Sequence, residues 1–135
     1  MNINSENSIV IDDEINKDLV IDDANLIGEL KRQKDLIYKW GSYLSKLEDA
    51  YKKICLQLDV LIKEKYIFYS SEYEKVLNSN EVKIYVTGDA EIINLKNKKR
   101  KLETIIDTIR HGIVAIKTRG KTINLLIDQQ RLNNL

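Results

Sequence analysis

Apolar side chains recur along the first half of the chain in alternating steps of four and three residues. Eleven of the thirteen positions from Leu26 to Phe68 are apolar or aromatic, and only Gln33 and Lys65 break the pattern. This spacing places the side chains on one face of an α-helix. The thirteen positions are Leu26, Leu30, Gln33, Ile37, Trp40, Leu44, Leu47, Tyr51, Ile54, Leu58, Leu61, Lys65 and Phe68.

The start and the continuity of this helix can also be predicted. Asp22 or Asp23 can cap its first turn, because a carboxylate accepts hydrogen bonds from the free N–H groups there. A straight helix of this length would measure about 63 Å, which is longer than a small domain. We therefore expect a bend or break within residues 35–41, where Gly41 weakens the helix.

A second stripe with the same spacing runs through the C-terminal part of the chain and is rich in isoleucine. It predicts a second long helix, which could pack against the first as an antiparallel hairpin. Two long helices alone leave apolar faces exposed, and isoleucine-rich seams favour assemblies larger than dimers, so we also expect a homo-oligomer. Gly120 would permit a bend or a close approach of another helix. The stripe comprises Leu102, Ile106, Ile109, Ile113, Ile116, Gly120, Ile123, Ile127, Gln130 and Asn134, and it is apolar from 102 to 127 except at Gly120. The expected assembly positions are Ile109, Ile113, Ile116, Gly120, Ile123 and Ile127.

The stretch between the two stripes has a different pattern. Residues 82–87 alternate between aliphatic side chains and larger or polar ones, which is typical of a β-strand over about 80–88. Residues 87–89 predict a turn, after which Asp89 could cap a short helix at 90–95. We therefore predict a mainly α-helical fold with one short irregular or strand-like insert at about 80–88. The expected parts of this single domain are a mobile acidic arm at 1–11, N-terminal helices at 12–70 with a short helix possible at 12–17, an irregular connector at 71–95 and an assembly helix at 96–135.

Composition agrees with a helical chain and adds an uneven distribution of charge. The 135 residues include no proline, and the net charge is +1. Residues 1–30 hold eight acids and one base, whereas the remainder holds 13 acids and 21 bases. An acidic arm before a basic body indicates a polyanion or an acidic partner for the body. A solvated acidic tail on a helical protein would give the same count.

The chain has few residues suited to catalysis or metal binding. Cys55 and His111 are the only members of their kinds, so zinc-ligand spacing is absent. No glycine-rich phosphate loop or nucleophile elbow occurs in the sequence. No apolar run approaches the roughly 20 residues that span a bilayer, and the single cysteine fits a reducing cytoplasm. We therefore expect no enzyme, no cofactor and no metal.

The stretch KEKYIFYS, residues 63–70, places two lysines beside a dense group of aromatic side chains. Lys65 falls on the apolar stripe, so it projects from among aromatic and aliphatic neighbours. One interpretation is a lysine near a helix end, whose stem packs while its ammonium reaches water. The other is a platform for phosphates and unstacked bases, because stacking contributes about 1–3 kcal/mol per base. The candidate DNA-binding residues are Lys63, Lys65, Tyr66, Phe68 and Tyr69.

A second basic stretch, KNKKRK, covers residues 96–101 with five bases in six positions. Such a run is usually a solvated helix face, and at a helix start the dipole disfavours cations. Contact with a nucleic acid or an acidic protein is the alternative. The candidates for that contact are Lys96, Lys98, Lys99 and Arg100.

Three segments together resemble the UvsY-type recombination mediators of bacteriophages. INKDLVIDDANL (15–26) is similar to the family's N-terminal segment before a long helix, and KEKYIFYS is similar to its basic-x-basic motif followed by aromatics. AIKTRG (115–120) resembles a segment of its assembly region. Lys63 matches the first basic position and Lys65 the second, which is often arginine, so Lys65 lacks arginine's bidentate phosphate geometry.

The resemblance implies a homo-oligomeric ring, of six or seven subunits, that binds single-stranded DNA. It also implies action in the cytoplasm of an infected bacterium. There the ring would remodel the coat of single-strand-binding protein and help to load a RecA-like recombinase for recombination and repair. The competing hypothesis is a helical oligomeric adaptor or structural protein that binds no nucleic acid.

Overall fold

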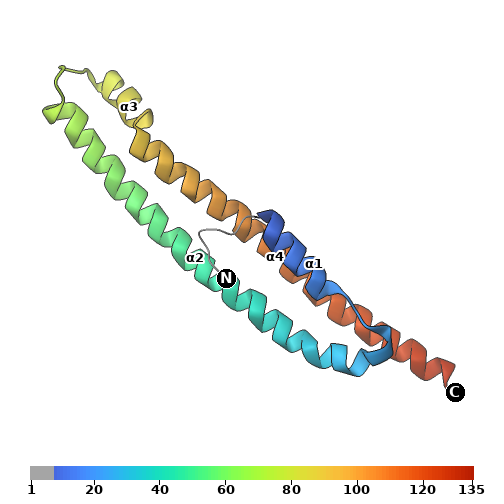
Figure 1. Ribbon diagram of the computed structural model, residues 1–135. Coiled ribbons are helices and arrows are strands. Elements are labelled where there is room, and N and C mark those ends of the chain that lie inside the picture. Colours follow the sequence, from blue (N-terminus) through green and yellow to red (C-terminus); the bar gives the residue numbers. More distant parts are fainter. Residues whose placement is uncertain (1–7) are drawn as a thin grey trace. The chain divides into compact units, whose positions relative to one another are not determined.

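The computed structural model describes residues 8–135, and these form helices joined by short turns (Figure 1). No strand occurs among the described residues. Two of the helices are long, as the two apolar stripes predict. The elements in chain order are α1 (Ser8–Leu19), the short 3-10 helix η1 (Asp23–Asn25), α2 (Leu26–Ile67), the π-helical turn η2 (Phe68–Glu72), α3 (Ser79–Thr87) and α4 (Ala90–Asn133).

The predicted strand at 80–88 is wrong, because these residues form helix α3. Asn78 and Glu81 make a capping box: the Asn78 side chain accepts from the Glu81 N–H at 2.9 Å, and the Glu81 side chain accepts from the Asn78 N–H at 3.2 Å. Val82 and Val86, four residues apart, are both buried, whereas Ile84 between them is 69% exposed. Residues four apart lie on the same face of a helix, so Val82 and Val86 are buried together. Ile84 lies between them in sequence but on the exposed side, and this produced the apparent strand-like alternation.

Three other boundaries also differ from the expectation. Helix α2 continues through Gly41, so no break occurs within 35–41. Helix α1 begins at Ser8 and buries Ile11 completely, so the last four residues of the expected mobile arm are helical. The rest of that arm, residues 1–7, lies outside the described residues. The connector at 71–95 is largely helical, because α4 already begins at Ala90.

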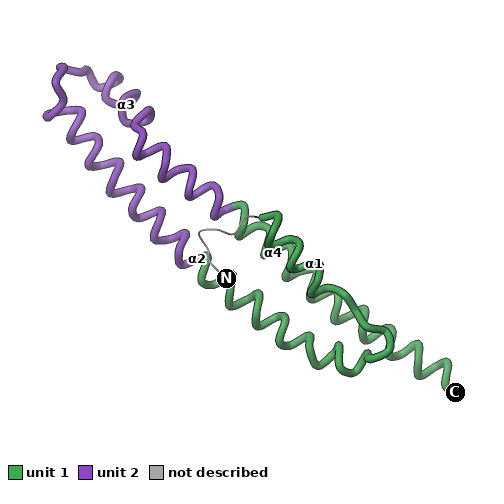
Figure 2. Tube along the Cα trace, viewed as in Figure 1, with its two compact units in different colours: residues 1–47, 104–135 green, residues 48–103 purple. Residues whose placement is uncertain are grey.

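The chain divides into two compact units (Figure 2). Unit 1 comprises residues 1–47 and 104–135, and unit 2 comprises residues 48–103. Both long helices contribute to each unit. The core of unit 1 combines side chains from α1, α2 and α4. Its buried apolar residues are Ile11, Ile15, Leu26, Leu36, Trp40, Leu47, Ile105, Ile106, Ile109, Ile116 and Ile123.

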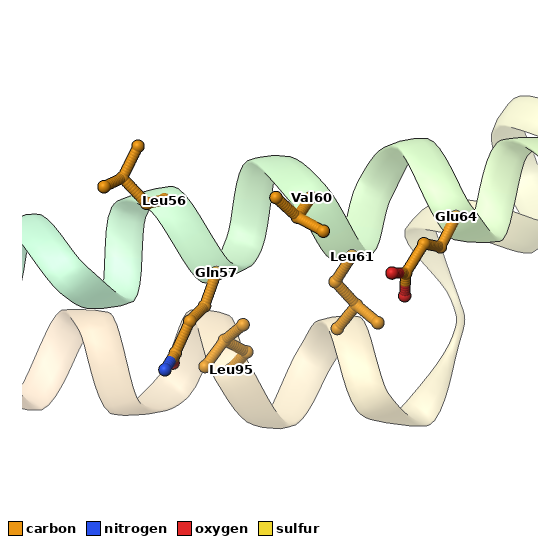
Figure 3. Close-up of a pocket in the computed structure, with 6 residues that line it drawn as sticks. All are labelled: Leu56, Gln57, Val60, Leu61, Glu64 and Leu95. Atoms are coloured by element: carbon orange, nitrogen blue, oxygen red, sulfur yellow. The ribbon is translucent and has the colours of Figure 1, made fainter.

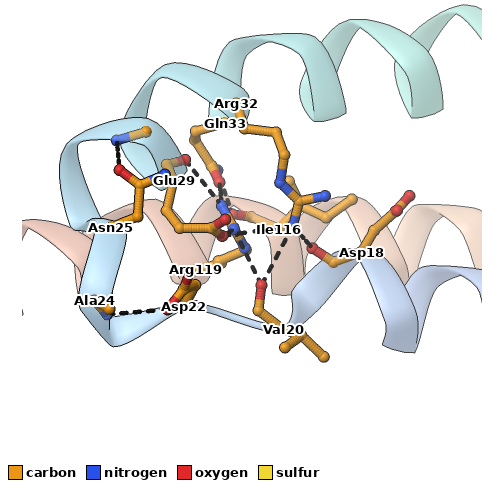
Figure 4. A network of polar contacts seen from close by, with 11 residues as sticks. Asp18, Val20, Asp22, Ala24, Asn25, Glu29, Arg32, Gln33, Ile116 and Arg119 are labelled. Carbon is orange, nitrogen blue, oxygen red and sulfur yellow. Dashed lines mark hydrogen bonds and ion pairs between the residues drawn. The ribbon is translucent and has the colours of Figure 1, made fainter.

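Unit 1 contains a buried polar network around Arg119, an arginine within the AIKTRG segment (Figure 4). Arg119 is 4% exposed and forms an ion pair with the carboxylate of Glu29. Its guanidinium also donates to the side-chain oxygen of Gln33 at 2.9 Å and to the backbone oxygen of Val20 at 3.2 Å. Burial lowers the pKa of Arg119, and the Glu29 carboxylate opposes that shift. The network joins α4 to α2 and to the segment that follows α1.

Two glycines of α4 allow close approach of its neighbours within unit 1. Gln33 donates its side-chain amide to the backbone oxygen of Ile116, and a Cβ on Gly120 would lie 3.1 Å from that amide nitrogen. A Cβ on Gly112 would collide with Ile15 of α1. Gln33 is thus a polar residue in the apolar stripe because its side chain bonds the backbone of α4. Gly120 permits the Gln33 side chain to approach α4 closely, as we expected of this glycine.

Two acids of the N-terminal segment are paired with a base inside unit 1. Asp18 accepts from the Lys39 ammonium at 2.8 Å and from the Trp40 indole N–H at 2.9 Å, and Glu14 pairs with Lys39 at 3.0 Å. Burial alone would raise the pKa of Asp18, but the bonds from Lys39 and Trp40 outweigh it and lower that pKa. Over its described residues, unit 1 holds ten acids and eleven bases, so the charges of this unit are nearly balanced.

Removing the buried guanidinium should destabilise the protein strongly. We expect Arg119→Ala to reduce the free energy of unfolding by about 3 kcal/mol, because Gln33 and the Val20 backbone oxygen lose their donor and Glu29 keeps only its longer contact with Arg32 at 3.5 Å. Urea denaturation followed by circular dichroism measures this change. The matched control is Arg110→Ala in the same helix, where the side chain is 58% exposed and pairs with Asp107 at 3.9 Å. The control should be destabilised by less than about 1 kcal/mol, and equal effects in the two variants would contradict the assigned role.

Candidate functional site

The KEKYIFYS segment lies where α2 ends, inside unit 2. The α-helix stops at Ile67, a π-helical turn follows, and the backbone becomes extended at Tyr73. The Ser71 hydroxyl donates to the backbone oxygen of Ile67 at 2.8 Å, which satisfies one free carbonyl at the helix end. The stretch is therefore the C-terminal end of a long helix.

Asp89, between α3 and α4, connects this helix end to the start of α4. Its Oδ1 accepts from the backbone N–H of Glu91 at 2.9 Å and of Ile92 at 3.4 Å, so Asp89 caps α4 as predicted. Its Oδ2 accepts from the Tyr69 hydroxyl at 2.6 Å and lies 3.4 Å from the Lys65 ammonium. The Asp89 side chain is 8% exposed, so one buried carboxylate holds three elements of unit 2 together.

The bonds to Asp89 shift the pKa values of both partners in the Asp89–Tyr69 pair. Burial alone would raise the pKa of Asp89, but the Tyr69 hydroxyl, the α4 backbone N–H groups and Lys65 lower it overall. The bond to Asp89 raises the pKa of Tyr69 to about 12. By linkage, Asp89 contributes stability that is lost as the pH falls through its lowered pKa, and the Tyr69 contribution is lost as the pH rises through about 12.

The two lysines of the segment have different environments. The Lys65 ammonium lies 3.4 Å from both Asp89 and Glu91 and 5.9 Å from the centre of the Phe68 ring, and its side chain is 19% exposed. Lys63 is exposed. Because residues two apart on a helix point about 200° from each other, the structure does not bring the two lysines onto one face.

Four aromatic rings gather around the helix end. Tyr69 contacts Phe68 at 5.0 Å, Tyr73 at 5.3 Å and Tyr85 at 5.6 Å between ring centres. Tyr73 and Tyr85 also contact each other at 5.4 Å. Phe68 and Tyr66 remain 38% and 37% exposed, so they offer ring surface to a ligand. The sequence pattern did not assign Tyr85 to this cluster, because α3 had been predicted as a strand.

The basic stretch at 96–101 lies in the second and third turns of α4 rather than at a helix start. The dipole penalty therefore does not apply, since it is confined to the first turn. Lys96 and Lys99 are half-buried, and the Lys99 ammonium lies 5.9 Å from the centre of the Tyr51 ring on α2. Lys98 and Arg100 are exposed. Both basic stretches, residues 63–70 and 96–101, belong to unit 2.

An open apolar groove of about 420 Å³ lies between α2 and α4 in the same unit (Figure 3). Leu56 and Val60 on its α2 side are 67% and 55% exposed. Its lining residues are Leu56, Gln57, Val60, Leu61, Glu64 and Leu95.

The six expected assembly positions fall into two groups. Ile109, Ile116 and Ile123 are completely buried inside unit 1, so their side chains already pack within one chain. The other three are half-buried, and they are Ile113, Gly120 and Ile127. Val114 and Leu125, outside the predicted stripe, are 63% and 65% exposed. The outward surface of α4 therefore differs from the stripe that the heptad count selected.

Among residues 8–135, no group of three or more histidine, cysteine or acidic side chains could hold a metal ion. His111 is exposed, and its Nδ1 lies 2.8 Å from the backbone oxygen of Asp107 one turn earlier. Within the described part of the chain, none of the helices combines the length and the apolar character of a membrane span. The described residues thus define an all-helical protein whose lysine and aromatic side chains gather in unit 2.

Comparison with known proteins identifies the family to which this chain belongs. Residues 14–134 match the family described as "Recombination, repair and ssDNA binding protein UvsY", and the chain belongs to that family. This confirms the resemblance drawn from the three sequence segments. No curated protein sequence matches the chain.

Crystal structures of the bacteriophage T4 recombination mediator protein UvsY have the same fold. One, of lattice type IV, superimposes with a TM-score of 0.84 over 95% of this chain and 99% of the T4 chain, at 23% identity. Another, of lattice type II, gives a TM-score of 0.83 over 100% and 99% of the two chains, at 20% identity.

Neutralising the Asp89 carboxylate should lower the pKa of Tyr69 toward the usual value for tyrosine. In the natural chain we expect Tyr69 to ionise near pH 12, and in Asp89→Asn we expect it to ionise closer to the usual pKa of about 10. NMR of protein labelled at the tyrosine ring measures each titration separately. The matched variant is Glu103→Gln, since the Glu103 bond raises the pKa of Tyr51 to about 12. It should lower the pKa of Tyr51 alone, and an unchanged Tyr69 in Asp89→Asn would refute the assignment.

Proposed function

We propose that this chain is a recombination mediator that binds single-stranded DNA through unit 2. The observation that carries the proposal is the exposure of Lys63, Tyr66 and Phe68 at the end of α2. An exposed ammonium and exposed aromatic rings within one short segment suit a strand that presents phosphates and unstacked bases at once, and stacking tolerates any base sequence. Membership of the UvsY family supports this assignment.

The proposed path of the strand also includes the basic stretch of α4. Lys98 and Arg100 are exposed in the same unit, and Lys96 and Lys99 lie beside them half-buried. Contacts to phosphate from such residues carry no sequence information, which fits a protein that must act on any single strand. Tyr69 supports the site indirectly, because its hydroxyl is bonded to Asp89 and its ring packs among the other aromatics.

The proposed action is non-enzymatic. The chain would bind a strand coated with single-strand-binding protein, remodel that coat and promote loading of a RecA-like recombinase in the cytoplasm of an infected bacterium. Few basic residues per subunit make a weak site, so we further propose a ring-shaped homo-oligomer of six or seven subunits that multiplies the contacts along one strand. The outward residues of α4 are the proposed assembly surface, because the fully buried isoleucines are already used within one chain.

Removing the exposed lysine tests the DNA site. We expect Lys63→Ala to weaken binding to a fluorescent oligonucleotide and to flatten its salt dependence, because each phosphate that a lysine neutralises contributes about 0.7 to the slope. In a ring of six subunits the slope would fall by about 4. Fluorescence anisotropy at several salt concentrations measures both quantities. Lys34→Ala, an exposed lysine of α2 in unit 1, is the control that should bind like the natural chain. Unchanged affinity and slope in Lys63→Ala would overturn the site.

Charged substitutions on the outer face of α4 test the assembly surface. Val114 and Leu125 are eleven residues apart, so they lie on one face of the helix. We expect Val114→Asp/Leu125→Asp to give smaller species by light scattering, with helix content retained. Ile116→Ala is the comparison, because it should destabilise the fold by about 2–5 kcal/mol through a core cavity without a direct effect on assembly. Full-size assemblies in the double variant would refute this surface.

A further inference from the structure

Two carboxylates face the single ammonium of Lys65. Asp89 Oδ2 and Glu91 Oε1 each lie 3.4 Å from the Lys65 Nζ. The three groups together carry one net negative charge. A DNA phosphate that approached Lys65 would therefore meet repulsion as long as both carboxylates remained in place. Burial alone would lower the pKa of Lys65, but its bonds to Glu91 and Asp89 raise it, so the ammonium stays charged.

The two carboxylates are held very differently. Asp89 is nearly buried and also accepts from Tyr69 and from two backbone N–H groups of α4, so it cannot leave without breaking the helix cap. The Glu91 side chain is 67% exposed. Its contact with Lys65 is the kind of exposed ion pair that contributes little free energy and is easily exchanged. Glu91 is thus the carboxylate that can move.

We propose that Glu91 competes with the DNA phosphate for Lys65. This inference rests on the proposed single-strand binding of unit 2. When a strand binds, its phosphate takes the place of the Glu91 carboxylate, while Asp89 keeps Lys65 beside the Phe68 ring. Replacing the Glu91 carboxylate by a phosphate exchanges one ion pair of Lys65 for another, so the exchange adds little net affinity. Glu91 therefore makes binding of the strand weaker than it would be if Lys65 were not paired with Glu91. A weaker grip suits a protein that must pass its strand to another protein.

In this proposal Lys65 contacts a DNA phosphate only after Glu91 has moved, whereas Lys63 can contact a phosphate without any such movement. Lys63 is exposed on a different face of α2 and can meet a phosphate directly. Lys65 becomes available only when the Glu91 side chain rotates away, and Glu91 lies in the first turn of α4, where the helix dipole also favours its charge. Neutralising Glu91 should therefore release Lys65 while leaving the Asp89 cap and the aromatic cluster intact.

The test compares Glu91→Gln with Glu74→Gln, which removes the same charge from an exposed residue of unit 2. Anisotropy with a labelled oligothymidylate measures both, each in the natural background and in Lys65→Ala. We expect Glu91→Gln to bind about two- to fivefold more tightly than Glu74→Gln, the range that an exposed ion pair supplies. In the Lys65→Ala background the two variants should bind alike. Circular dichroism confirms that each variant is folded.

Each other outcome overturns a specific part of the account. If Glu91→Gln binds no more tightly than Glu74→Gln, Glu91 does not compete for Lys65, although the DNA site survives. If the gain of Glu91→Gln persists in Lys65→Ala, it comes from general charge rather than from Lys65, and the proposal is wrong. If the natural chain does not bind the oligonucleotide at all, the proposed function itself fails, and that result is distinct from the other two.

Discussion

The buried carboxylate of Asp89 is the group on which the arrangement of unit 2 depends. It caps α4 through two backbone N–H groups, and its other oxygen accepts the Tyr69 hydroxyl and meets the Lys65 ammonium. Because a buried carboxylate without partners is costly, these partners must come together for the unit to fold. The same contact fixes where α2 ends, where α4 begins and how the aromatic rings are gathered. The candidate DNA surface is therefore built on a structural ion pair.

A similar logic operates in unit 1, around Arg119. Its guanidinium binds Glu29, Gln33 and the backbone oxygen of Val20, which ties the segment after α1 to both long helices. The two polar exceptions in the α2 stripe thus have one physical explanation. Gln33 bonds the backbone oxygen of Ile116 in α4, and Lys65 pairs with Asp89, the residue that caps α4, so each meets a buried polar partner in its own unit. Polar positions on an apolar stripe cost stability unless they are paired, so each marks a specific contact.

Much of the helical architecture could be predicted from local patterns. The two apolar stripes predicted the two long helices, and Asp89 was identified as a helix cap, because both signals act within a few residues. The predicted strand at 80–88 was wrong because six residues cannot distinguish alternation from a buried Val82–Val86 pair in a capped helix. The Arg119 network could not be predicted, since Glu29 lies 90 residues away along the chain. The sequence pattern selected Phe68 and Tyr69 but not Tyr85, which joins them from α3, and the pairing of Lys65 with two carboxylates depends on folding.

The central claim is that a single strand of DNA lies along unit 2. Ultraviolet cross-linking of a bound oligothymidylate, followed by mass spectrometry of the protein peptides, tests it most directly, because aromatic residues near thymine react efficiently. Cross-links are expected at Tyr66 and Phe68, with further adducts in peptides that contain residues 96–101. Cross-links confined to residues 8–47 and 104–135 would contradict this claim.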